Sequence, residues 1–440
     1  MTSNARVVVI GAGLAGARLA RRLGELGRPA LLVGEERHRP YNRVLLAEVL
    51  AGRYPPEVIG VPSGGAPTRA RVIGIDRRTR TVRCADGTPI PYDTLVLATG
   101  SNPVLPPLRG LFTGAAPELP DGVHAFRTMD DCLGLSRALR PGVRAVVIGG
   151  GLLGVSAARA LAVRGARVVL VQQAERLMER HLDPGASALV RRHLTGLGVE
   201  VHTECRVRGV RVAAGADGGA RTVEAVELAD GYALDTDLVV LACGVQPRVG
   251  LAEDAGLAVR QGVLVDDALR TSDPRIHAIG DCARHDGTLY GLAAPALEQA
   301  DTLARLLAGD GTARYTGTRA LTRLTLTGEA PAPVPPFGPG PGPGPGPGLG
   351  PGAGPDLDLA AFGDPVPLPG DDVVQLTDAT RGTYRKVVVR ADRLVGGVLV
   401  GELGSVGALA RAWEGTEPLP EEGPLLHLLT HGTHEGGPHD

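Results

Sequence analysis

The feature that most constrains this chain is a glycine pattern that occurs twice. One copy, Val7–Gly16, reads V-V-V-I-G-A-G-L-A-G, and the other, Ala145–Gly154, reads A-V-V-I-G-G-G-L-L-G. Each copy is an apolar run that leads directly into G-x-G-x-x-G, and a stretch rich in Ala, Arg and Leu then predicts a helix. A strand, a glycine turn and a helix in this order are typical of a dinucleotide site. One copy alone could be a tight turn that binds nothing, but two copies favour two dinucleotide sites with hydride transfer between them.

The three glycines of each copy have separate physical roles. The first permits the tight turn out of the strand, the second lets a pyrophosphate approach because it has no Cβ, and the third lets the helix pack close to the sheet. The N–H groups at the helix start then face the phosphates. The predicted dinucleotide-binding residues of the two loops are Gly11, Gly13, Leu14, Ala15 and Gly16, and Gly149, Gly151, Leu152 and Gly154.

Composition limits the remaining possibilities. The chain has 440 residues, of which 43% are hydrophobic, so it can form two to four domains with a large core. A net charge of −2 gives no electrostatic reason to expect nucleic acid. No apolar stretch is long enough to span a bilayer, and we expect a cytoplasmic protein without a signal peptide. The five cysteines contain no C-x-x-C pair, so we expect neither a redox disulfide of that spacing nor a metal site.

The segments between and after the glycine loops alternate as strands and helices. Strands are predicted at Pro29–Val33, Leu95–Ala98, Arg167–Val171, Leu238–Ala242 and Ile276–Ile279. An acidic residue about 20 positions after the first glycines is where a ribose contact is expected, and we assign Glu35 to it, with Glu36 as the alternative.

The C-terminal third contains a Pro/Gly tract from Pro331 to about Pro355. Such a tract has no side chains to bury, and we expect a disordered insertion over 331–370. Around it we predict a small α/β unit, with a last helix at Val406–Trp413. Its predicted strands are Leu321–Leu326, Val373–Leu376, Lys386–Arg390 and Leu394–Val400.

With these motifs in order, residues 5–310 resemble the FAD/NAD(P) disulfide-reductase-like flavoproteins that bind two dinucleotides. The resemblance implies FAD in the first glycine unit, NAD(P)H in the second, an Asp281 contact to the flavin ribityl chain and an Arg43 contact to the pyrophosphate. A solvated surface Arg is the alternative for Arg43. The other cofactor-binding residues that the resemblance implies are Val72, Thr99, Gly100, Ser156, Gln172, Gly244, Gly280 and Glu298.

Finer features are similar to one branch of this family. Tyr41-Asn42-Arg43, the G-G-G-L-L-G of the second loop and G-D-C-A at Gly280–Ala283 resemble the FAD module of NAD(P)H nitrite reductases and of the electron-transfer subunit of assimilatory nitrate reductases. Arg381–Glu402 resembles the segment that follows the flavin domains there. Larger relatives continue into iron–sulfur and siroheme segments, which this chain lacks, so we expect that it cannot reduce nitrite alone.

Three departures from the family pattern concern the flavin and the nicotinamide. The region Arg43–Leu50 has no cysteine beside the flavin, and Glu48 stands where many relatives have a lysine. Ser156 and Gln172 stand where many relatives have glutamate. Ser156 can still bond a nicotinamide amide, whereas the neutral Gln172 neither binds a ribose diol as a carboxylate does nor repels a 2′-phosphate. The branch favours NADH, but Gln172 removes the usual discriminator.

We therefore predict an α/β fold with two Rossmann-like dinucleotide-binding domains, for FAD and NAD(P), and a small C-terminal α/β domain. The FAD domain takes 1–115 and 246–315, the NAD(P) domain 116–245, the C-terminal domain 316–420, and 421–440 form a flexible tail.

The predicted function is that of an FAD-dependent NAD(P)H oxidoreductase, which passes electrons to an acceptor protein in nitrate or nitrite assimilation. The acceptor is a reductase subunit or a small iron–sulfur protein, and the chain is a monomer or homodimer. The cofactors carry the chemistry, so we expect no catalytic side-chain triad. The alternatives are a ferredoxin or rubredoxin reductase and a non-catalytic NAD(P)H-binding flavoprotein sensor.

Overall fold

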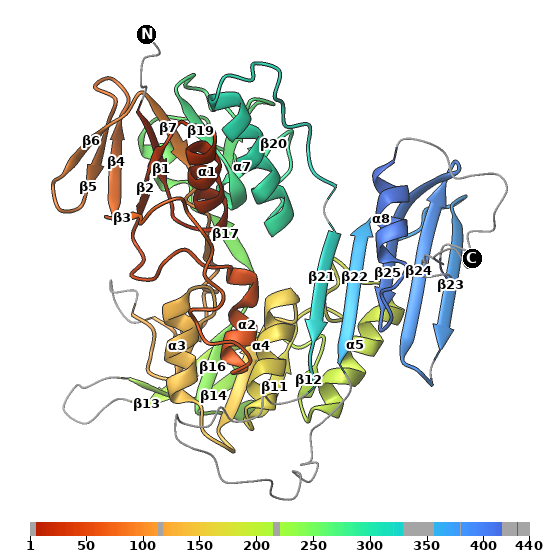
Figure 1. Ribbon diagram of the computed structural model, residues 1–440. Coiled ribbons are helices and arrows are strands. Elements are labelled where there is room, and N and C mark those ends of the chain that lie inside the picture. The colour runs from red at the N-terminus through yellow and green to blue at the C-terminus, as the bar shows by residue number, and fades with distance from the viewer. Residues whose placement is uncertain are drawn as a thin grey trace, which may run out of the picture.

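A computed structural model describes residues 6–112, 118–213, 221–319, 321–328, 356–378, 380–415 and 429. Figure 1 shows three units: one around β1 and α1, one around β10 and α4, and a C-terminal sheet beside α5. The predicted tract 331–355 lies outside the described residues, as do the residues of the predicted tail 421–440 other than Leu429. Leu429 itself is buried in the core of the C-terminal unit.

The first unit is built on a five-stranded parallel sheet that places β1 at its centre. Its strands, in spatial order, are β19 (Ile276–Ala278), β7 (Thr94–Leu97), β1 (Val7–Ile10), β2 (Ala30–Gly34) and β3 (Thr68–Arg69). Helices α1 (Leu14–Glu25) and α7 (Ala293–Leu307) pack together on one face, and an antiparallel sheet of β4 (Val72–Asp76), β5 (Thr81–Cys84) and β6 (Pro89–Pro91) lies beside it. The edge strand β19 comes after the whole second unit in the sequence and completes this sheet by pairing with β7.

The second unit repeats this arrangement around β10. Its parallel sheet is β12 (Glu200–His202), β11 (Arg167–Val171), β10 (Arg144–Ile148), β16 (Leu238–Leu241) and β9 (Val123–Ala125). Helices α2 (Leu46–Leu50), α3 (Met129–Ala138), α4 (Leu152–Val163) and α5 (Pro184–Gly196) pack with it, and β13 (Val207–Ala213), β14 (Thr222–Leu228) and β15 (Ala233–Asp235) form an antiparallel sheet. The central strands of parallel sheets are covered on both faces, which explains their uninterrupted apolar sequences.

Two short strands join the first unit to the second. After β7 the chain enters β8 (Ser101–Pro103), and after β16 it enters β17 (Val245–Pro247), and these strands pair antiparallel. Three smaller elements complete these units: α6 (Gly250–Asp254), β18 (Val263–Val265) and β20 (Ala283–His285).

The C-terminal unit corrects one prediction. Residues 356–370 belong to the predicted insertion 331–370, yet Leu357–Gly363 forms β22, which lies between β21 (Leu321–Leu326) and β25 (Arg393–Val400). The strand forms because its side chains alternate between two cores: Leu359 and Ala361 face the second unit, and Phe362 faces α8 (Val406–Glu414). The remaining strands of this antiparallel sheet are β24 (Thr383–Arg390) and β23 (Asp372–Asp378).

None of the helices that the structure describes is both long and apolar enough to cross a bilayer.

A buried ionic cluster fastens the C-terminal sheet to the second unit. Asp183 begins α5 and accepts a bond from Ala186 N–H at 3.0 Å. It also accepts one from the Tyr384 hydroxyl at 2.5 Å and pairs with Lys386 Nζ at 2.9 Å. Burial acts to raise the pKa of Asp183, but the bonds from Tyr384, Ala186 and Lys386 outweigh it, and the pKa is lowered. The only lysine of the chain is therefore used as an anchor between two units.

Lys386→Met should destabilise the C-terminal unit by about 3 kcal/mol, because it leaves the buried Asp183 carboxylate without its counter-charge. The emission of Trp413, the only tryptophan, reports on this unit during urea unfolding. Arg381→Met, in the turn before β24, removes an exposed pair with Asp378 at 3.9 Å and should leave the midpoint unchanged. Equal midpoints for both variants would contradict the anchoring role.

Candidate dinucleotide-binding site

The two glycine loops have the same backbone geometry. Gly11 and Gly149 each have φ of +110°, a conformation that glycine adopts without strain. Gly11 N–H donates to Val33 at the end of β2, and Gly149 N–H donates to Val171 at the end of β11, both at 2.8 Å. The repeat seen in the sequence is therefore a repeat of structure.

The first and third glycines are required by packing. A Cβ on Gly11 would lie 2.1 Å from the carbonyl oxygen of Ala98, and one on Gly149 would lie 2.4 Å from that of Ala242. A Cβ on the third glycine would lie within 2 Å of the carbonyl oxygen of the first: 1.9 Å in the first loop and 1.8 Å in the second, at Gly16 and Gly154. No other residue permits helices α1 and α4 to approach their sheets this closely.

The second glycines face empty space instead. A Cβ on Gly13 or Gly151 would meet no atom within 4 Å. Both residues are helix N-caps without a side-chain cap, and neither first turn carries an acidic residue. The N–H groups of both helix starts therefore point unpaired into the space that the missing Cβ leaves, which fits a pyrophosphate.

Both loops open into one cavity of about 2280 Å³. This volume exceeds the ~300–1,000 Å³ of an ordinary small-ligand pocket and suits two dinucleotides. The predicted cofactor-binding residues line it, with three exceptions. Gly16 and Gly154 serve helix packing, and Glu298 lies outside the lining, where it accepts a bond from Thr318 at 2.5 Å. Its neighbour Gln299 instead accepts the Gly280 N–H at 2.7 Å.

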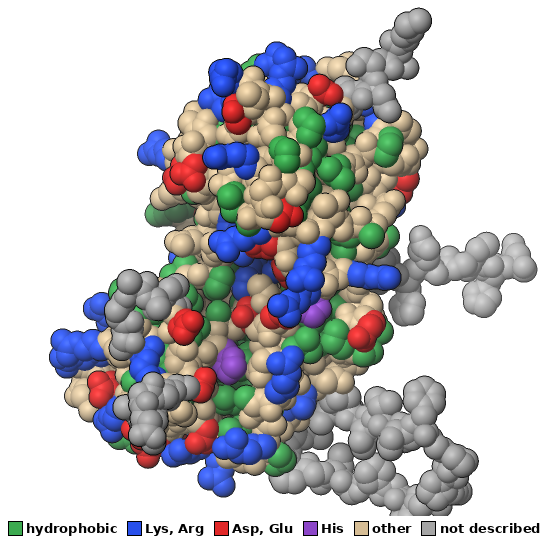
Figure 2. All heavy atoms as spheres, turned by 90° about the vertical axis from the view of Figure 1, so that its left-hand side faces the viewer, with side chains coloured by type: hydrophobic (Ala, Val, Ile, Leu, Met, Phe, Trp, Pro, Cys, Tyr) green, Lys and Arg blue, Asp and Glu red, His purple; other side chains and the backbone are tan. Residues whose placement is uncertain are grey.

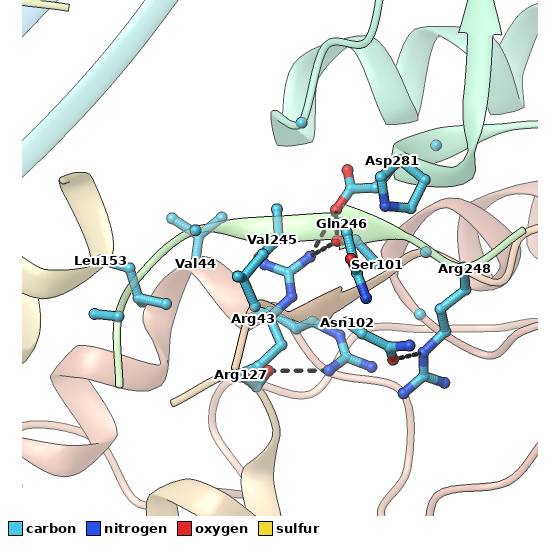
Figure 3. Close-up of a pocket in the computed structure, with 18 of the residues that line it drawn as sticks. Arg43, Val44, Ser101, Asn102, Arg127, Leu153, Val245, Gln246, Arg248 and Asp281 are labelled. Atoms are coloured by element: carbon cyan, nitrogen blue, oxygen red, sulfur yellow. Dashed lines mark hydrogen bonds and ion pairs between the residues drawn. The ribbon is translucent and has the colours of Figure 1, made fainter. Parts of the chain in front are cut away.

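The predicted ribityl contact, Asp281, lies in a polar cluster (Figure 3). One carboxylate oxygen, Oδ2, accepts bonds from Arg127 Nη2 at 2.6 Å and from Ser101 Oγ at 2.9 Å. Arg127 also donates to Ser101 Oγ at 2.7 Å. Burial lowers the pKa of Arg127, against the opposing charge of Asp281. The arrangement holds Asp281 in place and leaves Oδ1 free of any bond to the described residues.

Glu35 and Glu36 have different surroundings. Glu35 is half exposed at the cavity rim and pairs with Arg248 at 2.5 Å. Glu36 is held by Arg43 and by the Tyr41 hydroxyl, which donates at 2.7 Å. Both carboxylates therefore already have protein partners, and the assignment of the ribose contact to Glu35 stays a prediction. Arg43 lines the cavity and also donates to Arg127 O at 3.0 Å, so its side chain is partly buried at the cavity wall.

Sequence reasoning missed Arg127, Ser101 and Arg248. Arg127 follows β9, which pairs in parallel with β16, so its position at the carboxyl edge of the sheet follows from the topology. The sequence carried one signal for it, the Thr128–Asp131 capping box that begins α3 directly after Arg127. Ser101 and Arg248 belong to the β8 and β17 segments, whose pairing is not local.

The nicotinamide side contains the two residues that depart from the family pattern. Ser156 lines the cavity, and its hydroxyl donates to Leu152 O at 2.8 Å. Gln172 Oε1 accepts the Gly150 N–H at 2.9 Å, so this side chain braces the glycine loop. Beside it, Cys205 N–H donates to Gln172 O at 2.9 Å and places Arg206 at the cavity wall.

The lining residues taken together give the cavity its charge. Arginines outnumber carboxylates among them by eleven to four, although the whole chain has a net charge of −2. Figure 2 shows basic side chains around the hollow between the upper and lower parts of the molecule. Such a cavity attracts the pyrophosphates of both dinucleotides.

The cysteines do not form a redox pair. All five are described and free, and only Cys205 and Cys243 line the cavity. Burial raises the pKa of Cys243 to about 11, so its thiol stays protonated and unreactive near neutral pH.

The two glycine loops have the same geometry and open into one cavity rich in arginine. Together they define an oxidoreductase that uses FAD and NAD(P)H. The chain belongs to the pyridine nucleotide-disulphide oxidoreductase family, whose model matches residues 5–300. The model of the rubredoxin NAD+ reductase C-terminal domain matches residues 354–414, which include β22 to α8.

Three relatives illustrate the similarity. The nitrite reductase [NAD(P)H] large subunit of Klebsiella oxytoca is 34% identical over 90% of this chain and 38% of the relative. The assimilatory nitrate reductase electron transfer subunit of Bacillus subtilis is 30% identical over 90% of this chain and 48% of the relative. A crystal structure of a covalent putidaredoxin reductase–putidaredoxin complex superimposes with a TM-score of 0.78 at 25% identity, over 99% of this chain and 100% of that chain. The chain thus spans less than half the length of the first two relatives.

Substitution of the second glycines should separate the two sites. Gly13→Val should abolish FAD retention, because its side chain occupies the space left for the pyrophosphate. Gly151→Val should leave a yellow protein that dithionite bleaches but NAD(P)H does not. Absorbance spectra of the purified protein, and of the flavin that heat releases from it, test both expectations. Gly16→Val is the folding control, since its Cβ would collide with Gly11, and it should lower the soluble yield. FAD loss in both cavity variants, with normal circular dichroism, would contradict the assignment.

Gln172→Glu should raise the NADH/NADPH ratio of kcat/KM about tenfold, which corresponds to ~1.4 kcal/mol. The carboxylate would repel a 2′-phosphate while still accepting the Gly150 N–H. Gln173→Glu, also in the cavity wall, controls for added negative charge and should change the ratio less. An unchanged ratio in Gln172→Glu would indicate that Arg206 distinguishes NADH from NADPH, since Arg176 does not line the cavity.

Proposed function

We propose that this protein passes electrons from NAD(P)H through FAD to a separate acceptor protein in nitrate or nitrite assimilation. The observation that carries the proposal is the similarity to nitrite reductase and nitrate reductase electron transfer subunits, which extends over 90% of the chain. The two family models that match residues 5–300 and 354–414 include both glycine loops and most of the C-terminal sheet. The acceptor in this proposal is a siroheme- or iron–sulfur-containing reductase subunit.

The site supplies position and charge for this chemistry. Bound nicotinamide donates a hydride and flavin accepts it, and a reduced flavin can release its electrons one at a time. The two uncapped helix starts would hold the pyrophosphates, Asp281 and Glu35 would bind the sugar-like parts, and Arg43 and Arg127 would offset phosphate charge. Among the residues that the structure describes, no group of three His, Cys, Asp or Glu side chains could hold a metal ion.

A ferredoxin or rubredoxin reductase is the second candidate. The match of residues 354–414 to the rubredoxin NAD+ reductase C-terminal domain supports it. So does the structural similarity to putidaredoxin reductase in complex with putidaredoxin. In both candidates the partner is a redox protein, and the two differ in its identity.

We keep the cytoplasm as the proposed location, because all five cysteines are free, as reducing compartments favour. A monomer or homodimer remains our proposal for the oligomeric state.

The acceptor can be identified with the purified, FAD-loaded chain under anaerobic conditions. NADH or NADPH is supplied, and a ferredoxin, a rubredoxin and a siroheme nitrite reductase protein are tested in parallel, with ferricyanide as a general acceptor. We expect the chain alone to reduce ferricyanide rapidly. Nitrite should be consumed only when the siroheme protein is also present. Gly151→Val should stop both reactions and serves as the negative control.

Two results would contradict this proposal in different ways. A ferredoxin or rubredoxin reduced at least about 100-fold more efficiently than the siroheme protein would establish the second candidate. A flavin that NAD(P)H does not bleach, in protein that retains FAD, would exclude both electron-transfer functions and favour a sensor.

A further inference from the structure

Arg159 occupies an unusual position in the middle of α4. Among the buried polar and charged side chains of the described residues, it alone has no exposed surface. A guanidinium cannot lose its charge under ordinary conditions, so its burial has to be offset by close partners. Those partners come from two other parts of the molecule.

The first partner is Glu48 of α2, whose Oε1 lies 2.5 Å from Arg159 Nη2. The Glu48 side chain is 15% exposed, and its second oxygen, Oε2, has no hydrogen-bond partner in the described part of the chain. The nearest other cation, Arg53 Nη1, is 3.9 Å from that oxygen. Burial raises the pKa of Glu48 and lowers that of Arg159, and the ion pair opposes both changes.

The second partner is Thr327, which follows β21. Arg159 Nη1 donates to the Thr327 carbonyl at 3.2 Å and to its hydroxyl. One guanidinium therefore joins α4, α2 and the first strand of the C-terminal sheet, which meet around α4 in Figure 1. The three segments lie far apart in the sequence, and Arg159 is bonded to both of the others.

The location of this junction relates it to the cavity. Ala47, the neighbour of Glu48, lines the cavity from α2. Ser156, one helical turn before Arg159, lines it from α4. The N-terminus of α4 carries the second glycine loop, and η1 (Arg43–Leu45), directly before α2, carries Arg43, which we assign to the FAD pyrophosphate. The ion pair thus connects the helix behind the second glycine loop with the helix that follows Arg43.

We propose that Arg159, through Glu48 and Thr327, is a positioning residue that sets the distance between the nicotinamide and the flavin. Hydride transfer requires the two reacting atoms in near-contact geometry, and a displacement of about 1 Å can reduce the rate about 100-fold. Arg159 does not touch the reacting atoms. It restrains α4 against α2, so that nicotinamide bound to one wall reaches flavin bound to the other. The inference concerns flavin reduction alone and does not depend on which protein accepts the electrons.

The test uses the FAD-loaded full chain and the double variant Arg159→Met/Glu48→Leu. This variant removes both charges together, so no unpaired charge remains in the core. We expect retained FAD, a limiting rate of flavin reduction about 10- to 100-fold lower, and a dissociation constant for NADH within about threefold. Hydrogen–deuterium exchange of the amides in Leu46–Leu50 and Gly149–Ser156, measured without nicotinamide, should become faster. Arg159→Lys keeps the ion pair but loses the planar fork of the guanidinium. Its limiting rate of flavin reduction should fall between those of the unchanged chain and the double variant.

Arg164→Met is the matched control. Arg164 lies at the end of the same helix and also contacts α2, with Nη1 donating to Leu50 O at 3.0 Å. Unlike Ser156, it is outside the cavity lining. Its variant should keep the limiting rate within about twofold. The proposal is overturned if the double variant reduces its flavin at the normal rate with unchanged exchange, or if Arg164→Met is slowed equally.

Discussion

The close approach of helices α1 and α4 to their parallel sheets is the constraint on which the rest of this structure depends. At Gly16 and Gly154 a single Cβ would lie within 2 Å of a carbonyl oxygen, so the helix starts can stand this close to the strands only with glycine there. That closeness directs unpaired N–H groups into the cavity. These helix starts are the two positions where we propose that the pyrophosphates bind.

Charge is distributed to match these positions. The cavity is rich in arginine although the chain is slightly acidic, and several arginines are already paired with carboxylates, as Arg127 is with Asp281. Such pairs keep the binding groups ordered and reduce the rearrangement that cofactor binding requires. Two further buried cations, Arg159 and Lys386, act between units instead of at the cavity wall. Arg159 does so through Thr327 and Lys386 through Asp183, and these two contacts connect the C-terminal sheet to the nucleotide-binding unit.

The sequence predicted the elements that depend on neighbouring residues. It did not predict an element that depends on strands far away in the chain. The strands Val7–Ile10 and Arg167–Val171 lie where the apolar runs predicted them, because a parallel strand covered on both faces has to be apolar throughout. β22 falls within the predicted insertion 331–370, although the Pro/Gly tract on which that prediction rests ends at about Pro355. It becomes a strand only because β21 and β25 pair with it on both sides.

The sequence by itself determined the two dinucleotide loops, since a glycine turn and the helix start after it are set by residues adjacent in the chain. It also determined the class of chemistry, because two such loops on one chain imply two dinucleotides. Only the tertiary structure decided which side chains complete the site. Arg127 and Asp281 are 154 positions apart, and Arg159 and Glu48 are 111 apart. No local pattern encodes such pairs, because strand order and helix packing bring their partners together.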